Sequence, residues 1–290
     1  MKFILKKILP SLFIFGIVFL SYNILFPNDF FLPKIEYIKN NDFFFKQTPT
    51  RLTIYDKRKT NEELLKLIEN PDLHLNLSSN LFKNNSKRTL GIEIIGSKKY
   101  LIKKFNYKNL YDWISKCPFR SSKAYRSWFY AYQLKKMGVM TIEPVAIIEK
   151  RIGPFWTKTY LITEYVEAKT LKESLDLNFK QLDVCSKLVD VLNIFYKFRY
   201  VHRDFIGQNI LVTEDNVCII DLDEMHTYSF NNSIFRKKFF NKHLTKFLKK
   251  IPPESQFSKN FLMTHKNQSE YNCELKNSEK SWKRELELQH

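Results

Sequence analysis

Apolar residues recur along several stretches of the chain at intervals of three and four, the spacing that keeps side chains on one face of a helix. Residues 179–198 show this spacing most clearly, and we predict an amphipathic helix there. Its apolar positions are Leu182, Cys185, Leu188, Val189, Leu192 and Phe195. Residues 121–137 have the same spacing and stop at Gly138, a common residue just past a helix end. A shorter helix is predicted over residues 61–68.

Other stretches favour strands, because they are short, apolar and separated by turn residues. Residues 88–105 indicate a hairpin that turns at Gly96, and residues 144–166 indicate a second hairpin that turns at Gly153. Two short strands follow the long helix, within residues 210–221. Strands thus dominate the first part of the chain and helices the second. This order predicts an α+β fold with a β-rich lobe followed by a helical lobe.

The N-terminal region contains an apolar run, Ile8–Phe26, whose 19 residues carry no charge. That length is close to what spans the hydrocarbon of a bilayer. A cleavable signal peptide has a shorter apolar region and a small-residue cleavage site, so we expect an uncleaved transmembrane segment. Lysines flank the run on both sides, so the positive-inside rule gives no orientation. Residues 27–50 indicate a connector near the membrane surface.

The net charge of +18 indicates an anionic partner, which is a nucleic acid, an acidic membrane surface or a phosphorylated ligand. The stretch Phe235–Lys250 concentrates this charge, and its apolar residues recur at helical spacing. Such a helix binds a membrane surface, packs into a core with a solvated lysine face, or does both. Nucleic acid is disfavoured because no known nucleic-acid-binding module surrounds the stretch.

The remaining composition narrows the class of protein. A content of 44% hydrophobic and 16% aromatic residues excludes wholesale disorder. The four cysteines form no CxxC pair, which favours buried thiols in a reducing compartment over disulfides or a zinc site.

The chemistry concentrates in the stretch YVHRDFIGQNILV. Asn209 follows Asp204 after five positions, in the order H-R-D-x-x-x-x-N of a protein-kinase catalytic loop, and Asp221 ends the apolar run VCIID. Phosphoryl transfer needs a carboxylate at the attacking hydroxyl, oxygen ligands for Mg²⁺ and a cation on the phosphates. Each residue alone also suits a turn or a strand end. Together they favour Asp204 as the catalytic base, with Asn209 and Asp221 as metal ligands.

The phosphate-binding cation belongs on an upstream strand. Lys103 and Lys104 in the run YLIKKF point to opposite faces, because side chains alternate along a strand. We favour Lys103, while Lys104 stays open and a solvated strand face is the alternative for either lysine. Asp223 is either a third metal ligand or the ion-pair partner of Arg203, and we favour the ion pair because guanidinium binds carboxylate in a bidentate fork.

These motifs, in this order, are similar to those of the bacterial lipopolysaccharide core kinases, the family that includes Kdo and heptose kinases. The similar stretches within residues 85–250 are LIKKFNYKNLYDW, SSKAYRSWFYAYQLKKMGVMTIEPVAIIEKRIG, YLITEYVEAKTL, HRDFIGQNILV and IIDLDEM. The resemblance implies a two-lobed protein-kinase-like fold. It also implies ATP with Mg²⁺ as cofactors and a sugar hydroxyl of the lipid A–core as the acceptor.

The resemblance also assigns site residues. It implies that Lys103 anchors the phosphates, that Asp204 is the catalytic base, and that Asn209 and Asp221 hold the metal. The stretch Thr163–Val166 resembles the hinge that binds adenine through its backbone, which points to Glu164 and Val166 as cofactor-binding residues.

The chain departs from protein kinases in two places. It has no G-x-G-x-x-G loop, and the stretch Phe82–Gly91 stands in its place. That stretch favours a solvated basic loop over phosphate contacts; its polar residues are Lys83, Ser86, Lys87 and Arg88. The helix predicted over residues 121–137 has no acidic residue to pair with Lys103, and Ser127 stands near that place. Lys103 then pairs with another carboxylate, such as Asp221, or is not held as in protein kinases.

We therefore divide the chain into five parts. These are a transmembrane segment (1–30), a connector with a short helix (31–75), a β-rich lobe (76–165), a helical lobe (166–252) and a polar C-terminal tail (253–290). The expected function is phosphorylation of an inner-core sugar at the inner membrane, with the catalytic domain on the cytoplasmic side, where ATP is. The alternatives are a kinase for another small molecule or a protein, and a kinase-like binding or scaffold protein without catalysis. The acceptor sugar and the oligomeric state do not follow from the sequence.

Overall fold

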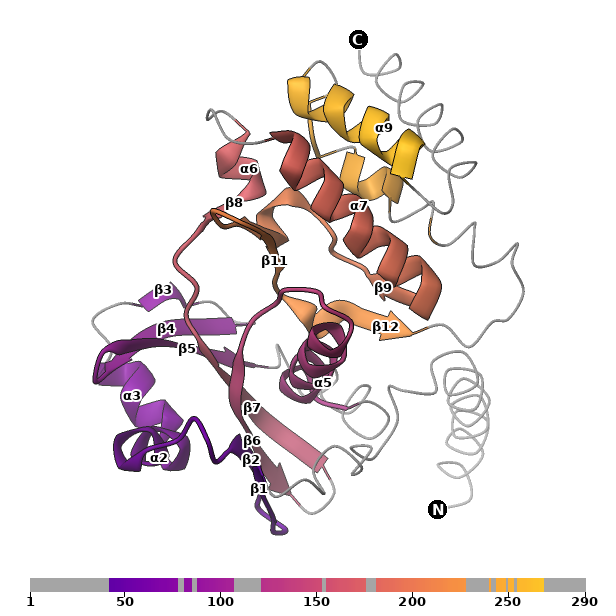
Figure 1. The fold of residues 1–290 in the computed structure, drawn as a ribbon. Helices are drawn as coiled ribbons and strands as arrows, with labels where there is room; N and C mark the ends of the chain where they lie inside the picture. The colour runs from indigo at the N-terminus through magenta and orange to yellow at the C-terminus, as the bar shows by residue number, and fades with distance from the viewer. Residues whose placement is uncertain are drawn as a thin grey trace, which may run out of the picture.

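The computed structural model of this chain describes residues 42–77, 81–84, 88–106, 121–152, 155–175, 181–227, 240, 244–248, 250–252 and 255–268. These residues form two lobes, one dominated by strands and the other by helices (Figure 1). Strand β7 (Phe155–Glu164) belongs to the first lobe, and the extended residues 165–168 lead from it into the second. The two-lobed α+β architecture predicted from the sequence is confirmed.

The first lobe is built on one antiparallel sheet with the strand order β1-β2-β6-β7-β5-β4-β3. The other strands are β1 (Phe43–Gln47), β2 (Arg51–Asp56), β3 (Leu81–Asn84), β4 (Arg88–Ile95), β5 (Lys98–Phe105) and β6 (Pro144–Ile152). The hairpin β4–β5 turns at Gly96, whose φ of +60° favours glycine. Strand β5 pairs with β4 on one side and β7 on the other, so Lys103 lies between Leu90 and Leu161 in the interior of the sheet.

Helices cover both faces of this sheet. Helices α2 (Glu62–Glu69) and α3 (Pro71–Leu77) pack on one face, where Leu64 and Leu67 join a core with Ile102. Helix α5 (Lys123–Lys136) packs on the other face, where Trp128 joins a core with Phe105 and Leu161. Because side chains alternate along β5, residues 103 and 105 share the face toward α5, and residues 102 and 104 share the face toward α3.

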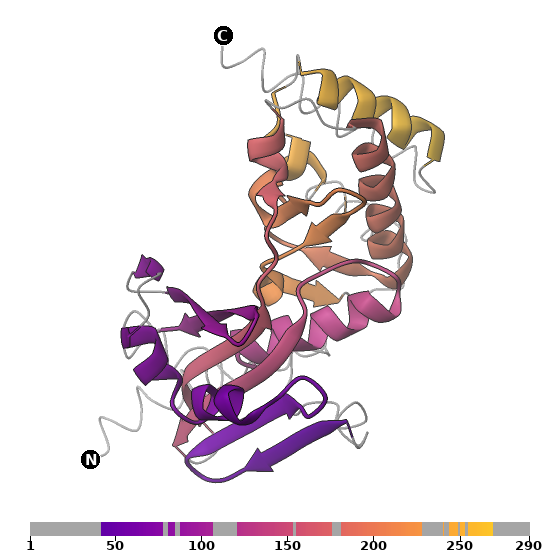
Figure 2. The ribbon, with the colours of Figure 1, turned by 60° about the vertical axis from the view of Figure 1, so that its left-hand side comes forward.

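The second lobe packs around α7 (Gln181–Phe198) and α9 (Gln256–Gln268), which lie against each other (Figure 2). Its shorter elements are β8 (Lys169–Thr170), α6 (Leu171–Ser174), β9 (Tyr200–His202), η3 (Gly207–Asn209), β10 (Ile210–Val212), β11 (Val217–Ile219), η4 (Leu222–Glu224) and β12 (Met225–Thr227). The strands form two small antiparallel sheets, β11-β10-β8 and β12-β9. One core joins Leu188 and Leu192 of α7 to Phe257 and Phe261 of α9.

The helix boundaries follow from capping residues in the sequence. Asn61 accepts from the backbone of Leu64 and begins α2, and Ser122 accepts from the backbone of Tyr125 and begins α5. Gly138 has φ +78° just beyond α5, as the stop signal predicted. The amphipathic helix predicted over residues 179–198 is confirmed as α7, and Leu182 in its first turn is 54% exposed.

Two segments are more structured than the sequence suggested. Within residues 31–75, where we expected a connector and a short helix, β1 and β2 extend the sheet, and β2 pairs with β6. Within residues 253–290, where we expected a polar tail, residues 256–268 form α9. Phe257 and Phe261 are four residues apart and therefore share the face of α9 that is buried.

Other predictions fall on parts of the chain that the structure does not describe. These are the run Ile8–Phe26, Cys117, Cys273, the side chains of Lys83, Ser86 and Lys87, and most of Phe235–Lys250. In the part of the chain that is described, no helix is both long and apolar enough to cross a bilayer. Cys185 and Cys218 are free and buried, as predicted.

Candidate active site

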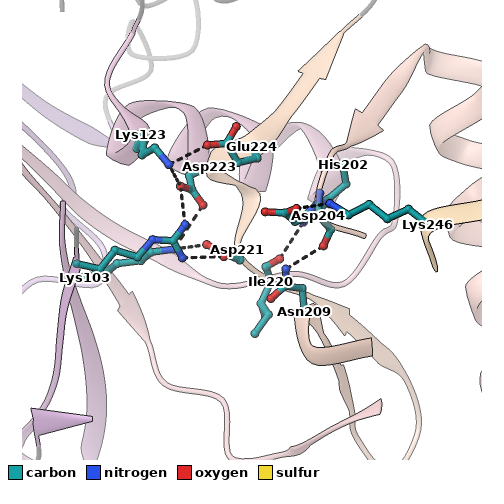
Figure 3. A network of polar contacts seen from close by, with 11 residues as sticks. Lys103, Lys123, His202, Asp204, Asn209, Ile220, Asp221, Asp223, Glu224 and Lys246 are labelled. Atoms are coloured by element: carbon teal, nitrogen blue, oxygen red, sulfur yellow. Dashed lines mark hydrogen bonds and ion pairs between the residues drawn. The ribbon is translucent and has the colours of Figure 1, made fainter. Parts of the chain in front are cut away.

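A cleft of about 460 Å³ lies where the two lobes meet, and its size suits a small organic ligand. Its lining includes five of the residues singled out from the sequence: Lys103, Glu164, Val166, Asn209 and Asp221. Figure 3 shows that Lys103 and Asp221 point toward each other, and that Asp204 and Asn209 lie beside them. The fold therefore gathers the predicted site residues from both lobes into one place.

Asp221 has an unusual backbone that directs its carboxylate. It lies two residues past β11 in the left-handed region, with φ 60° and ψ 48°. That conformation costs a residue with a Cβ about 1–2 kcal/mol, although Asp adopts it more readily than most. Lys103 contacts Oδ1 of this carboxylate, and Arg88 donates to Oδ2 at 3.0 Å. Both carboxylate oxygens of Asp221 therefore accept from cations of the first lobe.

Lys103 and Lys104 have different partners, as their alternation on β5 predicts. Lys103 is 9% exposed and pairs with Asp221 across the cleft. Lys104 lies on the other face of the sheet, with its Nζ 2.7 Å from Asp72 of α3. Asp72 also accepts from Lys150 and Tyr160, so Lys104 belongs to a structural cluster outside the cleft. The structure thus separates the two lysines, and only Lys103 lines the cleft.

Asp223 is fully buried, and among the described residues its ion pairs are with three cations. Its Oδ2 is 2.8 Å from Lys123 and 3.3 Å from Arg88, and its Oδ1 is 3.5 Å from Lys103. The ion pair with Arg203 that we predicted is wrong. Burial alone raises the pKa of the Asp223 carboxyl, but these cations, with Lys103 foremost, hold it well below its usual range. Asp223 is therefore a permanent anion.

Helix α5 contributes a lysine, and no acidic residue, to the site. It has no acidic residue, and Ser127 lines the cleft near Lys103. Lys123, the first residue of α5, donates to Asp223 and to Glu224, each at 2.8 Å. The helix thus carries the cation, and the segment after Asp221 carries the carboxylates. In protein kinases the corresponding helix carries the carboxylate instead. Lys103 takes Asp221 as its partner, which was one of the two outcomes expected.

The segment around Asp204 is held by His202. Its Nε2 donates to the carbonyl of Ile220 at 3.0 Å, and its Nδ1 accepts from the backbone N–H of Asp204 at 3.2 Å. Burial lowers the pKa of His202, so the ring is neutral and can hold both bonds. The backbone N–H of Ile220 also donates to the carbonyl of Asn209 at 3.0 Å. These bonds fix the position of Asp221 relative to Asp204.

Asp204 and Asn209 have complementary contacts. The Nδ2 of Asn209 donates to the backbone carbonyl of Asp204 at 2.8 Å, which leaves its Oδ1 as an acceptor beside the cleft. The Oδ1 of Asp204 is 2.6 Å from the Nζ of Lys246. The Asp204 side chain is 42% exposed, far more than Asp223. It is thus accessible to a second substrate.

The segment after β7 offers a backbone edge to the cleft. The N–H groups of Glu164 and Tyr165 donate to the carbonyls of Glu143 and Lys99. The Glu164 carboxylate pairs with Lys98 at 3.1 Å. Within the described residues, the N–H of Val166 has no backbone partner, and it is the first amide of this segment that a ligand can take.

The donor set fits a magnesium ion and a nucleotide. A carboxylate oxygen from Asp221 and an amide oxygen from Asn209 are hard ligands of the kind that Mg²⁺ takes together with phosphate oxygens and water. Lys103 and Arg88 both line the cleft and suit phosphate groups. Val166 also lines the cleft, and its backbone N–H can donate to a base.

Sequence reasoning missed three cations of this site. Lys123 and Lys246 were given no role, and Arg88 was interpreted as part of a solvated loop, whereas it contacts Asp221 and Asp223. A lysine in the first turn of a helix opposes the helix dipole, which was the available signal for Lys123. Nothing local in the sequence marks Lys246 apart from the other lysines of its segment.

Part of the chain is similar in sequence to known proteins. Residues 154–259 match the model of the RIO domain. A stretch of 71 residues is 34% identical to a probable serine/threonine-protein kinase of Clostridium acetobutylicum, and it covers 23% of this chain and 11% of that protein. The chain thus spans only about a tenth of the length of this curated relative.

One solved structure shows the same fold. A structure of WaaP in complex with acyl carrier protein is similar with a TM-score of 0.54 and 16% identity, over 78% of this chain and 98% of that one. A crystal structure of WbdD is similar with a TM-score of 0.42 and 14% identity, over 69% of this chain and 49% of that one. The fold is thus protein-kinase-like, and residues 154–259 carry the sequence pattern of the RIO domain.

Proposed function

We propose that the protein transfers the γ-phosphoryl group of ATP to a sugar hydroxyl of the lipopolysaccharide inner core, on Kdo or heptose. One observation carries the proposal. Lys103 and Asp221 meet across the cleft, while His202 and the backbone of Ile220 hold Asp204 and Asn209 beside them. Phosphoryl transfer depends mainly on such positioning and on electrostatics. The sequence resemblance to lipopolysaccharide core kinases supports the choice of acceptor.

Asp204 acts on the acceptor. Its carboxylate accepts a hydrogen bond from the attacking hydroxyl and orients it in line with the γ-phosphorus. A bond forms between the acceptor oxygen and phosphorus, and the bond from phosphorus to the β,γ-bridging oxygen breaks. The hydroxyl proton passes to Asp204 and then to solvent, and ADP leaves.

Residues that line the cleft hold the phosphates. Asp221 and Asn209 would hold Mg²⁺, which offsets the negative charge that develops on the transferring oxygens when it is bound. Lys103 and Arg88 release Asp221 and contact the phosphate oxygens instead. Val166 binds the adenine through its backbone N–H, and Glu164 contributes through its backbone.

We place the catalytic lobes at the cytoplasmic side of the inner membrane. A lipid A–core acceptor is anionic and embedded in a membrane, and the chain has a net charge of +18 that favours such a surface. ATP is available on the cytoplasmic side. A reporter enzyme fused after His290 should be active in the cytoplasm, and strong activity outside the inner membrane would contradict this location.

The test of the function compares three forms of the full chain in detergent. The unaltered protein, Asp204→Asn and Asp215→Asn are each incubated with Mg-ATP and lipid A–core oligosaccharide, and the oligosaccharide is weighed by mass spectrometry. Asp215 is an exposed carboxylate in the turn between β10 and β11, so it controls for the loss of a charge. We expect one added phosphate with the unaltered protein and the control, and a rate about 10²- to 10⁴-fold lower with Asp204→Asn.

One observation favours a second candidate, a kinase-like binding protein without catalysis. Both oxygens of Asp221 are already paired with Lys103 and Arg88, so a metal ion would have to displace these cations. Calorimetric titration with ATP, with and without Mg²⁺, separates the two functions. Binding that does not depend on Mg²⁺, together with no transfer to any hydroxyl acceptor, would support the binding protein.

A further inference from the structure

Asp204 is contacted by a lysine from a distant part of the chain. The Nζ of Lys246 lies 2.6 Å from Oδ1 of Asp204 and 2.8 Å from the backbone carbonyl of Arg203. Figure 3 shows the Lys246 side chain extending toward Asp204 from a segment outside the loop that contains Asp204. Its ammonium group thus contacts both the carboxylate and the backbone of that loop.

The neighbouring residues hold this lysine in place. Phe247 is fully buried and its ring lies 5.1 Å from the ring of Phe205, the residue after Asp204. Leu244 and Leu248 are buried in the same core. Consecutive residues of the two segments therefore meet as pairs, with Lys246 on Asp204 and Phe247 on Phe205. This double contact fixes the approach of the ammonium group.

A role in stability alone accounts poorly for the contact. The side chains of Lys246 and Asp204 are 44% and 42% exposed. Ion pairs that are this exposed to water contribute little to stability. Solvent screens their charges, and both side chains lose conformational entropy when they pair. The buried cluster around Asp223, by contrast, is shielded from water.

We propose that Lys246 is a positioning residue of the phosphoryl transfer, and this proposal rests on the function proposed above. Its ammonium group holds Oδ1 of Asp204 and leaves Oδ2 to accept the hydrogen bond of the acceptor hydroxyl. Its second bond, to the carbonyl of Arg203, keeps the carboxylate and the loop backbone in one arrangement. The hydroxyl therefore meets a carboxylate whose rotation is already restricted.

The test measures kcat and the KM for ATP, with lipid A–core oligosaccharide as the acceptor, for the unaltered chain and three variants. Lys246→Met should lower kcat about 10- to 100-fold, the cost of a misplaced catalytic group, and leave the KM for ATP within about twofold. Lys246→Arg should recover most of the rate, because it restores a cation. Lys250→Met, at an exposed position of the same segment, should be unchanged. Thermal unfolding should be nearly the same for all four proteins.

A double variant shows whether Lys246 acts through Asp204. In the Asp204→Asn background, Lys246→Met should lower the residual rate by less than about twofold, because the group that it positions is already lost. Independent effects that multiply would overturn the proposal, and so would an unchanged kcat in Lys246→Met alone. If the unaltered protein transfers no phosphate, the proposed function itself fails and the role of Lys246 fails with it.

Discussion

The two carboxylate centres of the candidate site differ in how their charge is balanced (Figure 3). At the first centre, Asp221 and Asp223 share cations from the first lobe, and Asp223 is fully buried. At the second, Asp204 pairs with Lys246 and is 42% exposed. A ligand at the first centre must therefore replace existing ion pairs, whereas a substrate at the second meets an accessible carboxylate. The first centre suits phosphates with a metal, and the second suits a neutral hydroxyl.

The largest expected effect comes from breaking the first centre. Asp221→Asn removes the negative charge of a metal ligand and one of the anions that balance Lys103 and Arg88. We expect turnover to fall about 10³-fold or more, since phosphoryl transfer depends mainly on the metal ion and on the cations that hold the phosphates. The excess positive charge should at the same time improve binding of ATP without Mg²⁺.

Calorimetric titration of Asp221→Asn with ATP, with and without Mg²⁺, tests the predicted change in ATP binding. The stimulation of binding by Mg²⁺ should disappear. A variant that keeps both turnover and Mg²⁺-stimulated binding would remove Asp221 from the metal site.

The next effect sharpens the contrast between neighbouring lysines. Lys103→Met should lower kcat/KM for ATP about 10²-fold, which corresponds to losing a charge-assisted phosphate contact. Lys104→Met should change kcat/KM less than about twofold, because Lys104 pairs with Asp72 on the other face of the sheet. Steady-state kinetics at varied ATP measures both. Equal losses in the two variants would contradict the assignment of Lys103.

A smaller effect, on stability, should follow from removing the ion pair of α5 with the first centre. Lys123→Met leaves the buried carboxylate of Asp223 with Arg88 and Lys103 only. We expect a loss of about 1–3 kcal/mol in the free energy of unfolding, below the cost of a fully unpaired buried charge. Urea unfolding measures it, and Lys123→Arg should restore most of the loss. An unchanged midpoint in Lys123→Met would show that the ion pair does not hold α5.

The smallest effect concerns a residue outside both centres. Burial lowers the pKa of His265 on α9 to about 4, below its ordinary value of about 6.5. The unfolded chain therefore takes up a proton that the folded chain does not, and stability falls as the pH drops from 7 to 5, by roughly 1–2 kcal/mol for this group. His202 also has a lowered pKa and acts in the same direction.

His265→Leu should reduce this pH dependence without abolishing it, because His202 remains. Urea unfolding at pH 7 and pH 5 measures the difference in both proteins. If the unaltered chain and His265→Leu lose the same stability over this range, His265 does not titrate as the structure indicates.

The sequence predicted the parts of the site that lie within one local segment. Asp204 and Asn209 lie within one loop, and the alternation on β5 separates Lys103 from Lys104, so spacing alone locates them. Lys123 and Arg88 were missed because their contacts join residues 100 and more positions apart. Which lysine of a basic segment reaches Asp204 depends on the packing of Phe247, which no local pattern encodes.

In the fold, too, local patterns were predicted and contacts between distant residues were missed. Hairpins and capped helices were predicted because turn and cap residues are neighbours in sequence. The pairing of β2 with β6 joins residues far apart, so β1 and β2 looked like a connector. Helix α9 did carry a local signal in the spacing of Phe257 and Phe261, but its polar composition obscured it.

The pairing of Asp221 with Lys103 and Arg88 has a mechanical consequence. These ion pairs run from β4 and β5 of one lobe to the loop after β11 of the other, so they tie the lobes together before any nucleotide arrives. When phosphates enter, the same two cations would bridge to the nucleotide, and the tie changes partners instead of forming anew. The distance between the lobes should then change little on binding, and small-angle X-ray scattering should give nearly equal radii of gyration with and without Mg-ATP.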